Sequence, residues 1–234
     1  MDYAYIDGEY RARALQGVRR VVVKVGTRLL TDMEGWSKAE RVGQLVGAIA
    51  QLRDRGLEVI LVSSGAIGAG MAMLKTTRRP KTVRGLQAHA AVGQSRLMSL
   101  YETACVGHGF HCAQLLLTAG DVKDHERHLN VTSCLEELLA RGVLPIINEN
   151  DSVSVEELKF GDNDLLAALV ATMTRADLTV LLTTVDGMYN PKAEGERKRL
   201  SVVCELTDEV LAMAGETDGN HFSVGGMLTK LQAA

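Results

Sequence analysis

The chain has few of the residues that mark several large classes of protein. Its four cysteines never form a Cys-x-x-Cys pair, so we expect small core residues rather than a zinc site or a disulfide framework. Aromatic residues make up 4% of the sequence, too few for platforms that stack nucleic-acid bases. The formal net charge is −3, and no apolar run approaches the roughly 20 residues that span a bilayer. We therefore expect a cytoplasmic protein whose partners include neither nucleic acid nor a membrane.

What the sequence does have is an alternation of apolar β-branched runs with amphipathic helical segments. With 46% hydrophobic residues over 234 positions, the chain can bury one large core. The alternation, with almost no hairpin signals in its first two thirds, predicts an α/β fold with a mainly parallel sheet covered by helices on both faces. Strands are expected over 21–25, 59–62, 112–117, 143–147 and 178–183, and helices over about 37–55, 86–106, 126–140, from 164, and over 208–213.

The densest group of polar side chains lies between residues 148 and 164. It starts where a buried strand is expected to end, and its second half opens a new apolar helix. Ligands of open α/β sheets bind at the carboxyl ends of the strands, where helix N-termini leave backbone donors unpaired. Taken alone, these residues are better explained as a solvated turn and a helix cap, and the rest of the chain shifts that balance.

Two lysines beside glycine turns favour phosphate chemistry at that edge. Lys24 interrupts a run of valines, a costly place for an ammonium group unless it reaches a polar ligand or a carboxylate, although a side chain that snorkels from a strand end is the alternative. Lys230 closely follows a Gly-Gly turn near the other end of the chain. Positioning and cationic stabilisation provide most of the catalysis in phosphoryl transfer. None of the glycine turns has the spacing of a P-loop or of a dinucleotide-binding loop.

Taken together, the motifs resemble the amino acid kinase family, and within it the branch that acts on glutamate. They occur in the family's order from about residue 21 to the end of the sequence. The matching phrases are VVKVGT at 22–27, VSSGAI at 62–67, AVGQSR at 91–96, PIINEND at 145–151, GDND at 161–164 and GGMLTKLQAA at 225–234.

This resemblance implies a three-layer αβα sandwich around a mainly parallel, roughly eight-stranded sheet. It also implies transfer of phosphate from ATP to the side-chain carboxylate of L-glutamate, giving γ-glutamyl phosphate in the first step of proline biosynthesis. Mg²⁺ would be held mainly by the nucleotide phosphates, with no metal site made of protein side chains. A substrate carboxylate is already a nucleophile at neutral pH, so the reaction needs no general base.

The resemblance also assigns roles to residues of the matching motifs. Lys24 and Lys230 would hold the phosphoryl group in flight, and Asp164 would orient them. Glutamate would be bound by Ser64, Gly65, Asn148, Asp151 and Asn163, with Asp151 facing its ammonium group. The ATP-binding residues would be Lys24, Gly26, Thr183, Thr184, Val224, Gly225, Gly226, Met227, Leu228, Thr229 and Lys230.

Two alternative functions remain open, and the resemblance also implies partners. The chain could be another small-molecule amino acid kinase, for example one acting on acetylglutamate, or a non-catalytic module that binds an amino acid or a nucleotide. The family implies a homodimer or tetramer and proline as a possible feedback inhibitor. We expect an N-terminal arm over 1–20 and one kinase domain over 21–234, apparently cut short at its C-terminus and without a second domain.

Overall fold

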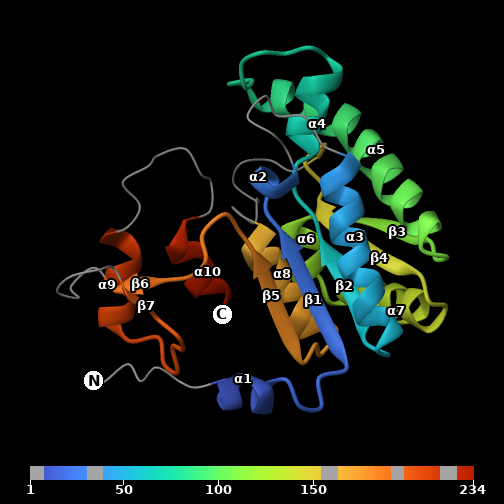
Figure 1. Cartoon of the computed structure of the whole chain (residues 1–234). Coiled ribbons are helices and arrows are strands. Elements are labelled where there is room, and N and C mark those ends of the chain that lie inside the picture. Colours follow the sequence, from blue (N-terminus) through green and yellow to red (C-terminus); the bar gives the residue numbers. More distant parts are fainter. Residues whose placement is uncertain (1–7, 31–38, 154–162, 191–197, 217–225) are drawn as a thin grey trace. The chain divides into compact units, whose positions relative to one another are not determined.

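The computed structural model describes residues 8–30, 39–153, 163–190, 198–216 and 226–234 (Figure 1). The chain forms two compact units, one of residues 19–184 and one of residues 1–18 with 185–234. The larger unit contains the strands β1 (Arg20–Val25), β2 (Glu58–Val62), β3 (Cys112–Leu117), β4 (Leu144–Glu149) and β5 (Leu178–Leu182). Its helices are α2 (Thr27–Leu30), α3 (Ala39–Asp54), α4 (Ala66–Met73), α5 (Val83–Gly107), α6 (Ala119–Lys123), α7 (His125–Ala140) and α8 (Asn163–Met173).

The five strands of the larger unit form one parallel sheet in the order β3-β4-β2-β1-β5. The central strands are almost wholly buried, which explains why they read as unbroken apolar runs rather than as alternating ones. Within this unit, helices cover both faces of the sheet (Figure 1). The predicted αβα sandwich with a parallel sheet is therefore confirmed, whereas the count of eight strands stays a prediction.

The apolar core on one face of the sheet joins β1, β2 and β4 to α7 and α8. Val22, Ile60 and Ile147 point to this face and pack against Leu135 of α7 and Leu166 of α8. The opposite face lies under α3 and α5, and α3 contributes a buried stripe at Val42, Val46 and Ile49. Of the cysteines, Cys105 is buried as expected, whereas the expectation is wrong for Cys134 and Cys204, which are exposed.

The predicted elements mostly match the structure, with shifts of a few residues at their ends. The helix predicted to end at Arg55 ends at Asp54, and Gly56 follows with a φ of +85°, the left-handed conformation expected after a helix. The long helix predicted from Leu86 begins earlier, at Val83, because the Thr82 side chain caps it by accepting a hydrogen bond from the Gly85 amide.

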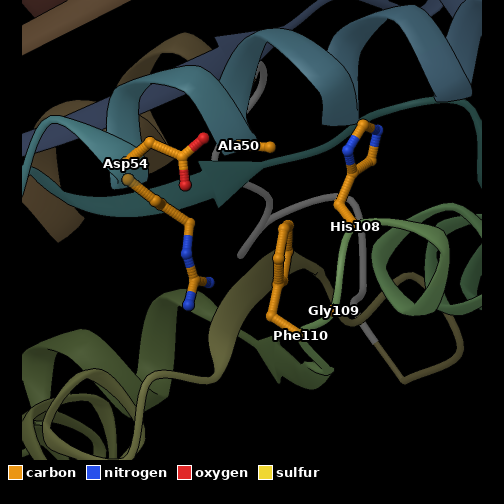
Figure 2. Close-up of a pocket in the computed structure, with 6 residues that line it drawn as sticks. Ala50, Asp54, His108, Gly109 and Phe110 are labelled. Carbon is orange, nitrogen blue, oxygen red and sulfur yellow. The ribbon is translucent and has the colours of Figure 1, made fainter.

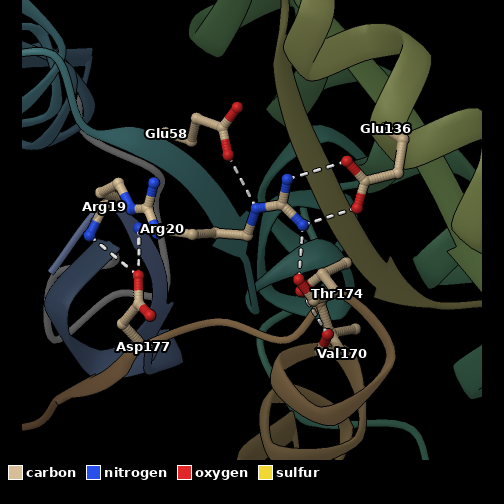
Figure 3. Close-up of polar contacts among 7 residues, drawn as sticks. All are labelled: Arg19, Arg20, Glu58, Glu136, Val170, Thr174 and Asp177. Carbon is tan, nitrogen blue, oxygen red and sulfur yellow. Dashed lines mark hydrogen bonds and ion pairs between the residues drawn. The ribbon is translucent and has the colours of Figure 1, made fainter.

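A cluster of charged groups holds the amino edge of the sheet together around Arg20 (Figure 3). Its guanidinium donates to Glu58 of β2 at 2.8 Å, to both carboxylate oxygens of Glu136 on α7, and to the Thr174 carbonyl at the end of α8. The backbone amide of Arg20 donates to Asp177 at 2.9 Å. One side chain on β1 thus connects two strands and two helices.

The smaller unit contains α1 (Gly8–Ala14), β6 (Tyr189–Asn190), β7 (Lys198–Arg199), α9 (Asp208–Glu216) and α10 (Met227–Ala233). Strands β6 and β7 pair in antiparallel fashion. Its small apolar core consists of Met188, Val210, Met213, Ala214 and Leu231. No helix among the described residues is long and apolar enough to cross a membrane.

Candidate active site

The carboxyl edge of the sheet gathers most of the predicted site residues of the larger unit. The parallel register pairs Lys24 of β1 with Val62 of β2, and Val62 with Ile147 of β4. The residues that follow Val62 and Ile147 therefore lie beside Lys24. Helix α8 begins at the same edge, with Asn163 and Asp164 in its first turn.

Lys24 and Asp164 form a buried ion pair. The Lys24 ammonium lies 2.6 Å from Oδ1 of Asp164, and the two residues are 5% and 0% exposed. A lysine that snorkelled from the strand end would leave its ammonium in water, so this burial excludes that interpretation. Two charges in such a place must be paired, and the arrangement holds a cation at a defined point of the sheet edge.

Three of the residues predicted to bind the amino acid meet through their side chains. The side-chain nitrogen of Asn163 donates towards the Ser63 carbonyl at 2.7 Å, the Ser64 hydroxyl at 2.8 Å and Oδ1 of Asn148 at 2.9 Å. Asn148 is almost fully buried, and Ser64 and Asn163 are half-buried. Asp151 lies two residues beyond the end of β4, in a turn, and is half-buried.

Sequence reasoning assigned no role to two side chains that support this cluster. Gln94 of α5 accepts a hydrogen bond from Asn148 at 2.9 Å. It belongs to the AVGQSR phrase, and the match of this phrase to the family was the one sequence signal that could have pointed to it. Tyr101 of α5 shares a hydrogen bond of 2.9 Å with the Ser63 hydroxyl, and its burial raises the pKa of its phenol. No pattern in the sequence indicates the Tyr101 contact.

Two glycines of the predicted site, Gly26 and Gly65, differ in conformation and contacts. Gly65 has a φ of +103° and caps the start of α4, a conformation that a side chain would strain. The backbone amide of Gly26 donates to the Leu182 carbonyl at 3.3 Å, so this donor joins the end of β1 to β5.

The predicted nucleotide-binding residues are divided between the two units. Thr183 and Thr184 follow β5 in the larger unit, and Thr184 is exposed. In the smaller unit, Gly226 precedes α10, which contains Met227, Leu228, Thr229 and Lys230, and the Thr229 hydroxyl donates to the Gly226 carbonyl at 2.9 Å. Val224 and Gly225 lie outside the described residues.

A pocket of about 300 Å³ opens at the other edge of the sheet (Figure 2). It lies between the end of α3 and the turn before β3, where the Arg53 guanidinium stacks 4.1 Å from the centre of the Phe110 ring. Asp54 and His108 also line it, together with Ala50 and Gly109. It contains none of the predicted site residues, and we do not assign the reaction to it.

Known proteins that are similar to this chain are kinases. The model of the amino acid kinase family matches residues 19–234. The chain is 47% identical over 226 residues to the glutamate 5-kinase of Trichlorobacter lovleyi, covering 96% of this chain and 60% of that protein. It is 48% identical to the glutamate 5-kinase of Geobacillus kaustophilus and 44% identical to glutamate 5-kinase 2 of Bacillus subtilis, covering 92% of this chain and 58% of each relative.

Among solved structures, the chain resembles a carbamate kinase from Giardia lamblia bound to AMP-PNP. The TM-score is 0.58 at 20% identity, over 94% of this chain and 87% of that one, which indicates a shared fold. The chain spans about 60% of the length of the curated relatives that it matches. From its fold, its motifs and the family model that matches 216 consecutive residues, 19–234, the chain belongs to the amino acid kinase family.

Proposed function

We propose that the chain transfers the γ-phosphoryl group of ATP to the side-chain carboxylate of L-glutamate, giving γ-glutamyl phosphate and ADP. This is the reaction of the glutamate 5-kinases to which it is similar, and it would be the first step of proline biosynthesis. The observation that carries the proposal is the buried Lys24–Asp164 ion pair next to the side chains of Asn148, Asn163 and Ser64.

The ion pair suits phosphoryl transfer between two anions. Negative charge is spread over the transferring oxygens, and a fixed cation in a water-poor site stabilises it without having to reorganise. Asp164 fixes the Lys24 ammonium at 2.6 Å. The glutamate carboxylate attacks phosphorus directly while the bond to the bridging oxygen of ADP breaks, so no side chain has to remove a proton.

The polar cluster suits a free amino acid. Asp151 would pair with the ammonium group of glutamate, and Ser64, Gly65, Asn148 and Asn163 would bind its polar groups. Both the hydroxyl of Ser64 and the amides of the two asparagines belong to one connected set of hydrogen bonds. Such a set fixes the direction of each donor and acceptor before the ligand binds.

For ATP, the matching motifs support contacts with Lys24, Gly26, Thr183 and Thr184, and with the residues from Val224 to Lys230. Mg²⁺ would neutralise the nucleotide phosphates, and those phosphates would supply most of its oxygen ligands because the Asp164 carboxylate is already paired with Lys24.

The proposal is tested by trapping the acyl phosphate with hydroxylamine in the presence of ATP and Mg²⁺. L-Glutamate should give the hydroxamate, whereas N-acetyl-L-glutamate and L-aspartate should give little. Product from acetylglutamate instead would identify a different amino acid kinase. Binding of glutamate or ATP to the folded chain without any transfer would favour a non-catalytic binding module.

A variant separates the glutamate site from the nucleotide site. Asp151→Ala removes the carboxylate proposed to face the substrate ammonium, and we expect the KM for glutamate to rise at least about tenfold, since a charge-assisted contact is lost. The KM for ATP should stay within twofold. An unchanged KM for glutamate would remove Asp151 from the substrate site.

We also propose a homodimer or tetramer and feedback inhibition by proline, both supported by family membership. Sedimentation of the purified chain tests the first. Adding L-proline to the hydroxamate assay at several glutamate concentrations tests the second. Inhibition that glutamate relieves would indicate competition for one site.

A further inference from the structure

Gln94 stands directly behind the cluster proposed to bind the amino acid. It lies in α5, is 8% exposed, and its Oε1 accepts a hydrogen bond of 2.9 Å from the side-chain nitrogen of Asn148. The two residues are separated by 54 positions in the sequence. A polar side chain buried to this degree requires a partner, and here the partner is a predicted substrate-binding residue.

The hydrogen bonds around Asn148 can run in only one direction. The backbone amide of Glu149 can only donate, and it lies 2.9 Å from Oδ1 of Asn148, so that atom must be the oxygen. The nitrogen of the same amide therefore faces Gln94 and needs an acceptor there. Gln94 supplies the acceptor, and with it the Asn148 side chain is held from both ends.

The same reasoning determines the orientation of the Asn163 side-chain amide. The Ser63 carbonyl can only accept, so the atom 2.7 Å away must be the side-chain nitrogen of Asn163. That nitrogen also points to Oδ1 of Asn148, which completes a path from Gln94 through Asn148 to Asn163. Each member sets the orientation of the next.

These hydrogen bonds leave one donor and one acceptor of the two asparagines available for an amino acid ligand. An asparagine side chain has two N–H donors and can accept two hydrogen bonds. The contacts of Asn148 use both acceptor positions and one donor, which leaves one N–H. Among the described residues, none donates a hydrogen bond to Oδ1 of Asn163. One donor for a carboxylate and one acceptor for an ammonium thus remain beside Ser64.

Close packing of two helices brings Gln94 to this position. A Cβ atom added to its neighbour Gly93 would lie 1.8 Å from the Ala66 carbonyl of α4, and one added to Gly70 of α4 would lie 1.9 Å from the carbonyl of His89 in α5. The helices can approach this closely only because both positions are glycine. Gln94 is thereby held at a fixed distance from β4.

We propose that Gln94 is a positioning residue for substrate binding: it orients the Asn148 side chain so that the remaining N–H of Asn148 faces a carboxylate oxygen of the amino acid. This inference rests on the proposed function and adds to it a residue that acts through Asn148 and does not touch the reacting atoms.

The test is a double-mutant cycle with Gln94→Met and Asn148→Ala in the hydroxamate assay. Methionine keeps the length of the side chain but offers no oxygen. Gln94→Met should raise the KM for glutamate about fivefold to tenfold, with the KM for ATP within twofold. In the Asn148→Ala background the same change should alter the KM for glutamate by less than twofold, because the residue through which Gln94 acts is gone.

Gln51→Met, at an exposed position of α3, is the matched control and should leave both KM values unchanged.

Two kinetic results would overturn the proposal. One is a Gln94→Met variant whose KM for glutamate equals that of the parent. The other is an equal rise of that KM in the parent and in the Asn148→Ala background, which would mean that Gln94 acts independently of Asn148.

A second measurement keeps the inference apart from the proposed function. In a ¹⁵N spectrum, the side-chain NH₂ signal of Asn148 is identified by its absence in Asn148→Ala, and its hydrogen exchange should be at least tenfold faster in Gln94→Met than in the parent. If the parent phosphorylates no glutamate, the proposed function fails, and this exchange rate still decides whether Gln94 holds Asn148. Equal exchange rates in the parent and in Gln94→Met would refute the proposal that Gln94 orients Asn148.

Discussion

At the scale of single residues, Lys24 is both a proposed catalytic group and the counterion of a fully buried carboxylate. Lys24→Met leaves the Asp164 charge without this partner, so the free energy of unfolding should fall by about 3–5 kcal/mol. The double variant Lys24→Met, Asp164→Asn removes both charges and should regain most of that stability while remaining inactive.

Urea unfolding and the hydroxamate assay separate the two roles of Lys24. The matched control is Lys123→Met, at an exposed position at the end of α6, which should change neither quantity. Activity in the double variant would show that Lys24 is not needed for transfer. Full stability in Lys24→Met alone would show that the ion pair does not hold the sheet edge.

Glu136 illustrates how one contact makes stability depend on pH. Its hydrogen bonds to Arg20 lower the pKa of its carboxyl group in the folded chain. A lowered folded pKa means that the contribution of Glu136 is complete above the unfolded pKa of about 4.3 and is lost as the pH falls below it. Because the side chain is 48% exposed, we expect only about 1 kcal/mol at pH 7.

The check is urea unfolding of the parent and of Glu136→Gln between pH 3.5 and 7. The difference in unfolding free energy should be constant from pH 7 to 5.5 and should shrink below pH 4.5. Glu137→Gln, which removes an exposed pair with Arg141 on the same helix, should cost less than about 0.5 kcal/mol at pH 7. A difference that grows on acidification would contradict the role given to Arg20.

At the scale of elements, α4 and α5 pack closely next to the proposed substrate site. Gly93→Ala would place a methyl group 1.8 Å from the Ala66 carbonyl, so the helices must move apart. We expect a loss of more than about 2 kcal/mol in the free energy of unfolding and a higher KM for glutamate, because the neighbouring Gln94 moves as well. Thermal unfolding and the hydroxamate assay measure the two effects.

Gly43→Ala is the matched control for this prediction. Gly43 lies inside α3, and a Cβ atom there would have no heavy atom within 4 Å. The helix preference of alanine should therefore stabilise the chain by up to about 1 kcal/mol. Equal effects of the two substitutions would mean that the close approach of α4 and α5 is not needed.

At the scale of the whole molecule, local signals and long-range contacts differ in how far the sequence predicts them. The valine run of β1, the turn at Gly56 and the lysine within apolar residues are local patterns, and they predicted a strand, a helix end and an ammonium group that needs a polar ligand or a carboxylate. The role of Asp164 beside Lys24 came from the resemblance to the family. The Asn148 and Asn163 side chains lie in the polar segment expected at the carboxyl edge of the sheet, whereas their shared role in binding the amino acid came from the resemblance to the family.

Contacts between distant segments had no such signal. The hydrogen bonds of Asn148 with Gln94, and of Ser63 with Tyr101, join α5 to residues at the ends of β4 and β2 that are far from it in the sequence. The Arg20 cluster likewise joins four elements through one side chain. These contacts depend on tertiary geometry, which the period of a strand or helix does not contain.

The last prediction concerns the two compact units. Lys24 belongs to the larger unit and Lys230 to the smaller one, and both are proposed to hold the phosphoryl group. A ligand that binds only the folded state stabilises what it contacts, by about 2.7 kcal/mol at 100 times its dissociation constant. AMP-PNP with Mg²⁺ should therefore slow amide hydrogen exchange both in peptides from 19–184 and in peptides from 185–234.

In Lys230→Ala, the protection added by AMP-PNP should be lost from the peptides of 185–234 and kept at least in part in those of 19–184. Protection confined to 19–184 in the parent would remove Lys230 from the nucleotide site and assign phosphate binding to the larger unit alone.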